Sequence, residues 1–162
     1  MTYNIHPIFV HFPIALLFLY SLVKIFPFEK WFPKVSWRHI ETFLLTFGVL
    51  GALAAIYTGG LVEHLVDSSN RQLVHMHELF AQISAFIYGA LLLGEILYFL
   101  TPTNSFLIFI QNILTKSFVS KILAALGLVA ITITGMLGGV IVFGLSADPL
   151  APIVLHILGI TY

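Results

Sequence analysis

The sequence has no cysteine and very little charge. Its 162 residues include only seven basic and seven acidic side chains, so the formal net charge is zero. A chain without cysteine cannot form disulfides, hold an iron–sulfur cluster, build a thiolate zinc site or attach a c-type haem covalently. A chain without a basic surplus cannot neutralise a run of nucleic-acid phosphates. We therefore exclude nucleic acid as a partner and expect any cofactor to be held by histidine, methionine, carboxylate or backbone groups.

Apolar residues are correspondingly frequent. Hydrophobic side chains make up 59% of the sequence, charged ones 9%, and the mean hydropathy is +1.04. A soluble domain of this length needs far more charge on its surface. The apolar residues fall into four long stretches, each near the ~20 residues that a helix needs to cross a bilayer. The sequence therefore predicts a membrane protein.

We predict an all-α fold, an integral membrane four-helix bundle with up-down topology, in a single membrane domain over residues 1–162. A short interfacial helix is expected at about 104–117, before the last membrane helix, because apolar and polar residues are mixed there at helical spacing. The four membrane helices are expected at about 7–26, 38–62, 73–100 and 118–145.

The basic residues predict the orientation of the bundle. Six of the seven lie in or beside the two loops that join helices one and two and helices three and four, and only Arg71 lies on the other side. Basic residues concentrate in cytoplasmic loops. Both termini should therefore be non-cytoplasmic, in a multi-pass protein of a bacterial inner (cytoplasmic) membrane. The six residues are Lys24, Lys30, Lys34, Arg38, Lys116 and Lys121.

Histidine is unusually frequent for a chain with so little polar chemistry. Up-down topology places six of the seven histidines at the non-cytoplasmic side, and only His39 at the other. A single histidine at a helix end is usually an interfacial side chain with a wet tip. Several from separate segments at one level instead indicate a site, because imidazole is a frequent metal ligand and the usual axial ligand of b-type haem. The six are His6, His11, His64, His75, His77 and His156.

Helical geometry separates these histidines. His75 and His77 differ by about 200° around their helix, so only one can face the bundle. His77 shares its face with alanine and glycine at steps of four residues, which makes it the better interior ligand. His6 and His11 differ by about 140°, and His11 lies about 7.5 Å deeper. We predict His11 and His77 as an axial pair that binds the iron of haem b, with His6, His75 and His64 as further candidate ligands.

Glu95 is the other ionisable residue inside a predicted span, five whole turns beyond His77. An ionisable residue within a membrane helix is a functional candidate. An ion pair with Arg38, Lys24 or Lys121 explains it equally well.

The residues His6-Pro7-Ile8-Phe9-Val10-His11-Phe12-Pro13 resemble the HPxxVHFP opening of a bacterial membrane-protein family filed as domain of unknown function twenty-two thirty-one. Three further features agree with that family: Tyr57-Thr58-Gly59 at the end of helix two, a histidine that opens helix three, and the segment 134–143, Thr-Gly-Met-Leu-Gly-Gly-Val-Ile-Val-Phe, in helix four. The resemblance implies a four-helix protein that binds haem through His77 and either His11 or His6. It names no reaction.

The leading functional hypothesis is a b-type haem protein for electron transfer. Its partners would be a quinone and an extracytoplasmic electron carrier, and it would act alone or as a subunit of a larger respiratory or photosynthetic complex. The first alternative is a non-catalytic accessory subunit packed against other membrane subunits. The second is a copper or zinc site built from His6, His11, His64 and His75 with Glu63 or Asp67. No serine or carboxylate pair has a spacing that favours hydrolysis, so an electron-transfer or accessory role is favoured over a stand-alone enzyme.

Overall fold

The computed structural model describes residues 6–62 and 71–160, and within these ranges it contains helices and no strand. The all-α prediction is confirmed. Each long helix begins and ends within two residues of its expected bounds, and a short helix also forms in the first loop. The elements are α1 His6–Ile25, α2 Phe28–Trp31, α3 Trp37–Val62, α4 Arg71–Leu100, α5 Ser105–Thr115, α6 Ser117–Phe143, the 3₁₀ helix η3 Gly144–Ala147 and α7 Ala151–Ile157.

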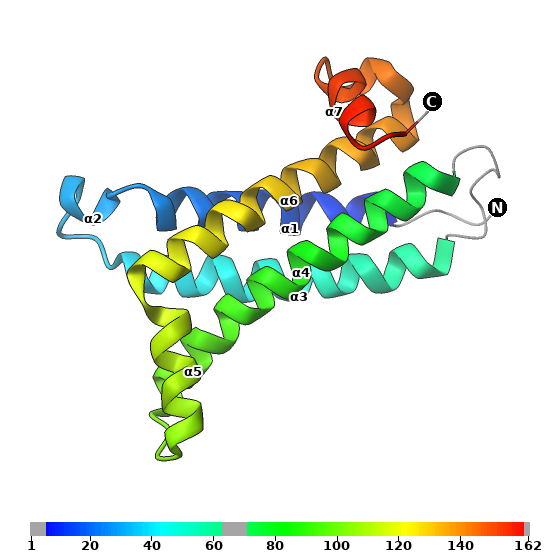
Figure 1. The fold of residues 1–162 in the computed structure, drawn as a ribbon. Coiled ribbons are helices and arrows are strands. Elements are labelled where there is room, and N and C mark those ends of the chain that lie inside the picture. The colour runs from blue at the N-terminus through cyan, green and yellow to red at the C-terminus, as the bar shows by residue number, and fades with distance from the viewer. Residues whose placement is uncertain (1–5, 63–70, 161–162) are drawn as a thin grey trace.

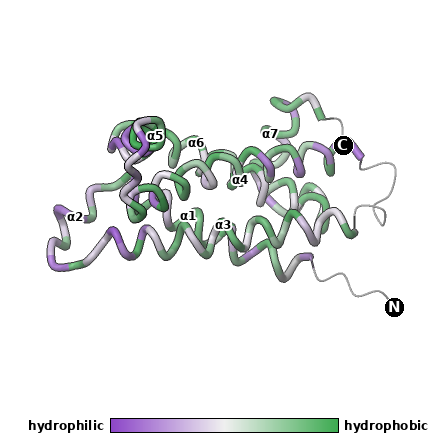
Figure 2. The backbone as a smooth tube through the Cα atoms, turned by 90° about the horizontal axis from the view of Figure 1, so that it is seen from below, coloured by the Kyte–Doolittle hydropathy of each residue, from purple (hydrophilic) through white to green (hydrophobic). Residues whose placement is uncertain are grey.

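Three segments in the described ranges are long and apolar enough to cross a membrane: Trp37–Leu61, Arg71–Leu100 and Ser117–Ala147. In α1 the described apolar segment, Phe9–Ile25, is shorter. In the apolar 18-residue window of each of the three long spans, only 33% of the residues are buried inside the bundle. The outward faces carry large apolar side chains, as faces that contact lipid do. Figure 2 shows how apolar residues run along these helices.

The bundle consists of two helix pairs that cross each other (Figure 1). α1 packs along α3, α4 packs along α6, and further contacts join α1 to α6 and α3 to α4. The start of α1, the start of α4 and α7 lie at one end of the bundle, and α2 lies at the other (Figure 1). We call these the histidine end and the α2 end. The alternation of direction follows from the short connections between long helices.

Close approach of the helices depends on small residues at the crossings. A Cβ atom at Gly127 of α6 would lie 2.8 Å from Cζ of Tyr88, and one at Gly48 of α3 would lie 2.5 Å from Cδ2 of Leu17. Both contacts are shorter than van der Waals distance, so larger residues at these positions would force the helices apart. Tyr88 and Leu17 are fully buried as a result and belong to the central core.

α5 lies across the direction of α1 and α3, beside the last turns of α4 (Figure 1). Its N-cap is Asn104, whose side-chain oxygen accepts hydrogen bonds from the backbone N–H groups of Phe106 and Leu107. Phe106 and Phe109 are 67% and 60% exposed. A helix with this placement and exposed apolar surface is typical of the membrane interface.

Candidate functional site

His6 is held by the end of α3. Its Nδ1 lies 3.1 Å from the hydroxyl oxygen of Thr58, and that hydroxyl donates its own hydrogen to the carbonyl oxygen of Ala55 at 3.1 Å. With the hydroxyl hydrogen on the Ala55 carbonyl, the hydroxyl oxygen accepts from His6, and in that arrangement the ring proton lies on Nδ1. A neutral imidazole in this tautomer has its lone pair on Nε2.

His77 is held by α6 in the same way. Its Nδ1 lies 3.0 Å from the backbone carbonyl oxygen of Thr134. A carbonyl can only accept a hydrogen bond, so Nδ1 of the ring donates and the lone pair of the neutral ring again lies on Nε2. The hydroxyl of Thr134 is directed elsewhere, because it donates to the carbonyl of Ala130 at 2.9 Å.

A glycine packs against each of the two rings. A Cβ atom at Gly59 would lie 3.2 Å from Cε1 of His6, and a Cβ atom at Gly138 would lie 3.2 Å from Cε1 of His77. Both distances are tighter than ordinary contact, so any larger residue would displace the imidazole. Each helix pair thus contributes one imidazole, fixed by a hydrogen bond from Nδ1 and seated on a glycine of the partner helix.

His6 comes from the α1–α3 pair and His77 from the α4–α6 pair, and both helices begin at the histidine end (Figure 1). Two imidazoles that approach from opposite helix pairs, with the lone pair of each on Nε2, match the donor set of a bis-histidine haem. The chemistry of these two donor nitrogens therefore suits the group that the sequence implied.

The other histidines that the structure describes lie in more exposed positions. His11, His75 and His156 are exposed, and His39 lies near the α2 end, where its Nδ1 is 2.7 Å from the Ser36 hydroxyl. His64, a further candidate ligand, lies outside the described residues. The sequence-based pairing of His11 with His77 stays a prediction, but the structure favours His6. The choice of His11 rested on depth along α1, whereas the hydrogen bond to Thr58 depends on how α1 lies against α3.

The described residues do not bring together a copper or zinc site. In ranges 6–62 and 71–160, no group of three or more histidine or acidic side chains could hold a metal ion. His6, His11 and His75 therefore do not form a group of three ligands, either with one another or with another histidine or acidic residue of these ranges. The other residues of that hypothesis, Glu63, His64 and Asp67, lie outside the described residues.

A second polar cluster lies toward the α2 end. The carboxylate of Glu95 accepts a hydrogen bond from Nη2 of Arg38 at 2.9 Å, which selects Arg38 among the three partners weighed from the sequence. The guanidinium also lies 3.4 Å from the ring centre of Tyr98. Glu95 is buried, and its ion pair joins α3 to α4. Lys24 of α1 makes a parallel ion pair with Glu41 of α3 at 2.8 Å.

Three residues of this region were missed by the sequence analysis. The hydroxyls of Ser21 and Tyr88 are 2.7 Å apart, and the ring of Tyr20 meets that of Tyr88 edge to face at 6.0 Å between centroids. All three are buried and join α1 to α4. Tyrosine and serine in an apolar run are usually interfacial or packing residues, which is why these three were not selected. The feature that could have identified them is that both tyrosines lie well inside their predicted spans.

A family model described as "Predicted membrane protein (DUF2231)" matches residues 2–147. The matched range contains His6, His77, the residues that hold them and both ion pairs, whereas α7 lies beyond it. No curated protein and no solved structure matches the chain. The chain therefore belongs to the DUF2231 family of predicted membrane proteins.

Proposed function

We propose that this protein binds one haem b through Nε2 of His6 and Nε2 of His77 and serves in electron transfer. The observation that carries the proposal is that Nδ1 of each of the two rings lies within hydrogen-bond distance of an oxygen on the neighbouring helix. Each donates from Nδ1 to an oxygen of the neighbouring helix, which is how proteins orient histidines that ligate a metal through the other nitrogen. A haem held in this way supplies reversible one-electron chemistry.

The residues around the rings have separate tasks in this proposal. The Thr58 hydroxyl and the Thr134 carbonyl hold the tautomer and make each ring a stronger ligand, because a hydrogen bond from Nδ1 raises the electron density on Nε2. Gly59 and Gly138 leave room for the rings to approach the helices closely. The apolar side chains of the four long helices keep water and charge away, which lets the protein tune the redox potential.

The electron partners follow from the position of the site. Both histidines lie at the histidine end, so we propose a quinone of the bilayer as one partner and an extracytoplasmic carrier as the other. Service as a subunit of a larger respiratory or photosynthetic complex agrees with the small size of the chain outside its helices. The alternative role, an accessory subunit without haem, would use the exposed apolar faces alone.

A reduced-minus-oxidised absorption spectrum of the protein purified from membranes tests this proposal. We expect a low-spin b-type spectrum, because two imidazoles give a strong axial field. Protein purified without haem, from cells supplied with iron and haem precursors, would overturn the proposal. Metal analysis and the mass of the complex in mild detergent would then decide between a copper or zinc protein and an accessory subunit.

We also propose that four helices span the membrane, with both termini on the non-cytoplasmic side. α1 has 20 residues, which at ~1.5 Å each reach about the thickness of the hydrocarbon core. The α2 end carries six of the seven basic residues and would face the cytoplasm.

A reporter active only in the cytoplasm should therefore stay silent when fused after Tyr162 and become active when inserted between Lys34 and Val35, in the first loop. A reporter of the opposite kind, active only outside the cytoplasm, should give the reverse pattern. Cytoplasmic activity after Tyr162 would contradict the topology and place the histidine end inside the cell.

A further inference from the structure

The α2 end carries lysines that take no part in the two ion pairs. Lys24 and Arg38 pair with Glu41 and Glu95, but four exposed lysines make no ion pair with any residue that the structure describes. They come from the first loop and from the junction of α5 with α6, which lie at the same end of the bundle (Figure 1). We call Lys30, Lys34, Lys116 and Lys121 the lysine collar.

Exposed aromatic residues accompany the collar. Trp31 and Phe32 are 57% and 55% exposed beside Lys30 and Lys34. On α5, Phe106 and Phe109 are exposed on the helix that leads to Lys116. Aromatic rings settle at the level of lipid headgroups, and lysines reach past them to the phosphates. The combination of surplus positive charge with exposed rings fits the surface of a bilayer.

Contacts among aromatic rings join the residues of the first loop. The Phe28 ring lies 5.2 Å from the ring of Trp31 and 5.2 Å from that of Trp37, measured between centroids. The indole N–H of Trp37 donates to the carbonyl of Phe32 at 3.0 Å. Trp37 is only partly exposed, whereas Trp31 is 57% exposed. The two tryptophans of the chain thus report on two different surroundings.

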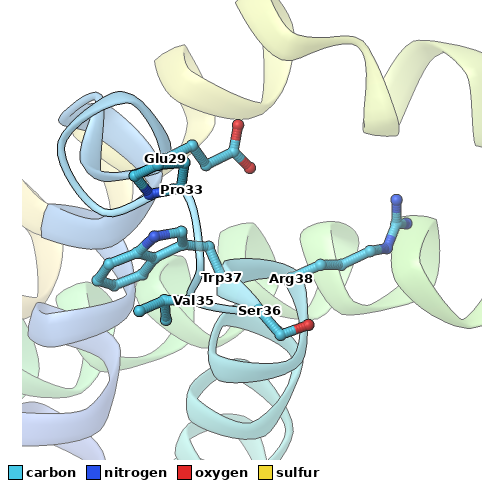
Figure 3. Close-up of a pocket in the computed structure, with 6 residues that line it drawn as sticks. All are labelled: Glu29, Pro33, Val35, Ser36, Trp37 and Arg38. Atoms are coloured by element: carbon cyan, nitrogen blue, oxygen red, sulfur yellow. The ribbon is translucent and has the colours of Figure 1, made fainter.

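The pocket in this loop is not the anion site. It has a volume of about 360 Å³ and is lined by Glu29, Pro33, Val35, Ser36, Trp37 and Arg38. Figure 3 shows the guanidinium of Arg38 extending away from the loop, in keeping with its ion pair to Glu95, while the carboxylate of Glu29 remains at the pocket. A phosphate would meet an acidic side chain there without a compensating cation. The positive charge available to a phosphate lies on the collar.

We propose that the lysine collar binds the phosphates of anionic phospholipids and that the aromatic residues beside it enter the headgroup region. The charge balance of this end supports the choice of lipid, because six basic residues face three acidic ones, Glu29, Glu41 and Glu95. A juxtamembrane lysine favours an anionic surface by about fivefold, and the effect falls off within a Debye length. The collar would thereby enrich anionic lipid around the cytoplasmic end of the bundle.

Quenching of tryptophan fluorescence by brominated lipid tests the collar. The full-length Trp37→Phe variant, in which Trp31 is the one tryptophan, is placed in phosphatidylcholine bilayers that contain a small fraction of brominated phosphatidylglycerol or, separately, brominated phosphatidylcholine. We expect the anionic quencher to act on Trp31 at a clearly lower mole fraction, on the order of tenfold. High salt should remove the difference, and inorganic phosphate at equal ionic strength should have no further effect.

Substitutions then assign the preference to the collar. Replacement of all four collar lysines with Gln should bring the two quenchers close to equal, whereas Arg71→Gln, an exposed basic residue at the histidine end, should change nothing. Neither change breaks an ion pair of the described residues, so both variants should fold, as circular dichroism can check. Equal quenching by both lipids in the parent protein, or a preference that survives the fourfold substitution, would overturn the proposal. Competition by free phosphate would also overturn it, because the collar would then bind a soluble anion rather than the lipid.

Discussion

Replacing His77 or His6 with alanine is expected to abolish the low-spin haem spectrum, whereas His11→Ala should leave it unchanged. Each loss removes one of the two proposed axial nitrogens, and among the described residues no group of three or more histidine or acidic side chains could hold a metal ion in their place. We expect haem content to fall on the order of tenfold or more, since changes even outside the ligand shell cost ~10–100-fold in metal affinity. The measurement is the ratio of haem absorbance to protein in material purified from membranes.

Added imidazole separates loss of a ligand from loss of the fold. In His77→Gly the side chain is removed while Thr134 and Gly138 remain, so free imidazole should occupy the space and restore the low-spin spectrum. Thr58→Val provides a milder test, because it keeps His6 and removes only the acceptor of its Nδ1 hydrogen bond. If His11→Ala loses the haem and His6→Ala keeps it, the ligands are the pair predicted from the sequence. A double variant of His6 and His77 with an unchanged spectrum would refute the site altogether.

Glu95→Gln is expected to lower the thermal stability of the protein in mild detergent. The substitution leaves the charge of Arg38 without its carboxylate, and breaking a buried ion pair costs about 3–5 kcal/mol when both partners are fully enclosed. The Glu95 side chain is only 10% exposed but that of Arg38 is 42% exposed, so solvent screens part of the loss. We expect a destabilisation of about 1–3 kcal/mol, with loosened packing of α3 against α4.

A double-mutant cycle checks the origin of this effect. Arg38→Gln alone should also destabilise, since it leaves a buried carboxylate unpaired, and the double variant should be less destabilised than the sum of the two single variants. Glu29→Gln serves as the matched control, because Glu29 is exposed and makes no ion pair with the described residues. Additive effects of the two substitutions would show that Glu95 acts through something other than Arg38.

The helices themselves were predictable because the signal for them is local. Four apolar runs, bounded by Pro, Gly and polar turns, gave the long helices to within two residues at each end. In a bilayer, a backbone must satisfy its own hydrogen bonds, so an apolar run of sufficient length has few structures open to it. The signal for α5 is local as well, because its apolar residues recur at helical spacing. The preference for His77 over His75 also came from spacing alone.

The tertiary structure was needed for every choice among residues on different helices. A helical wheel gives the angle between His6 and His11, but only the packing of α1 on α3 places His6 beside Thr58 and leaves His11 exposed. The sequence offered Glu95 three basic partners, and the crossing of α3 with α4 selected Arg38. Sequence thus determined the helices and their apolar faces, because those depend on neighbours along the chain. The contacts of each polar group were decided by tertiary structure, because they depend on the rotation and crossing of whole helices.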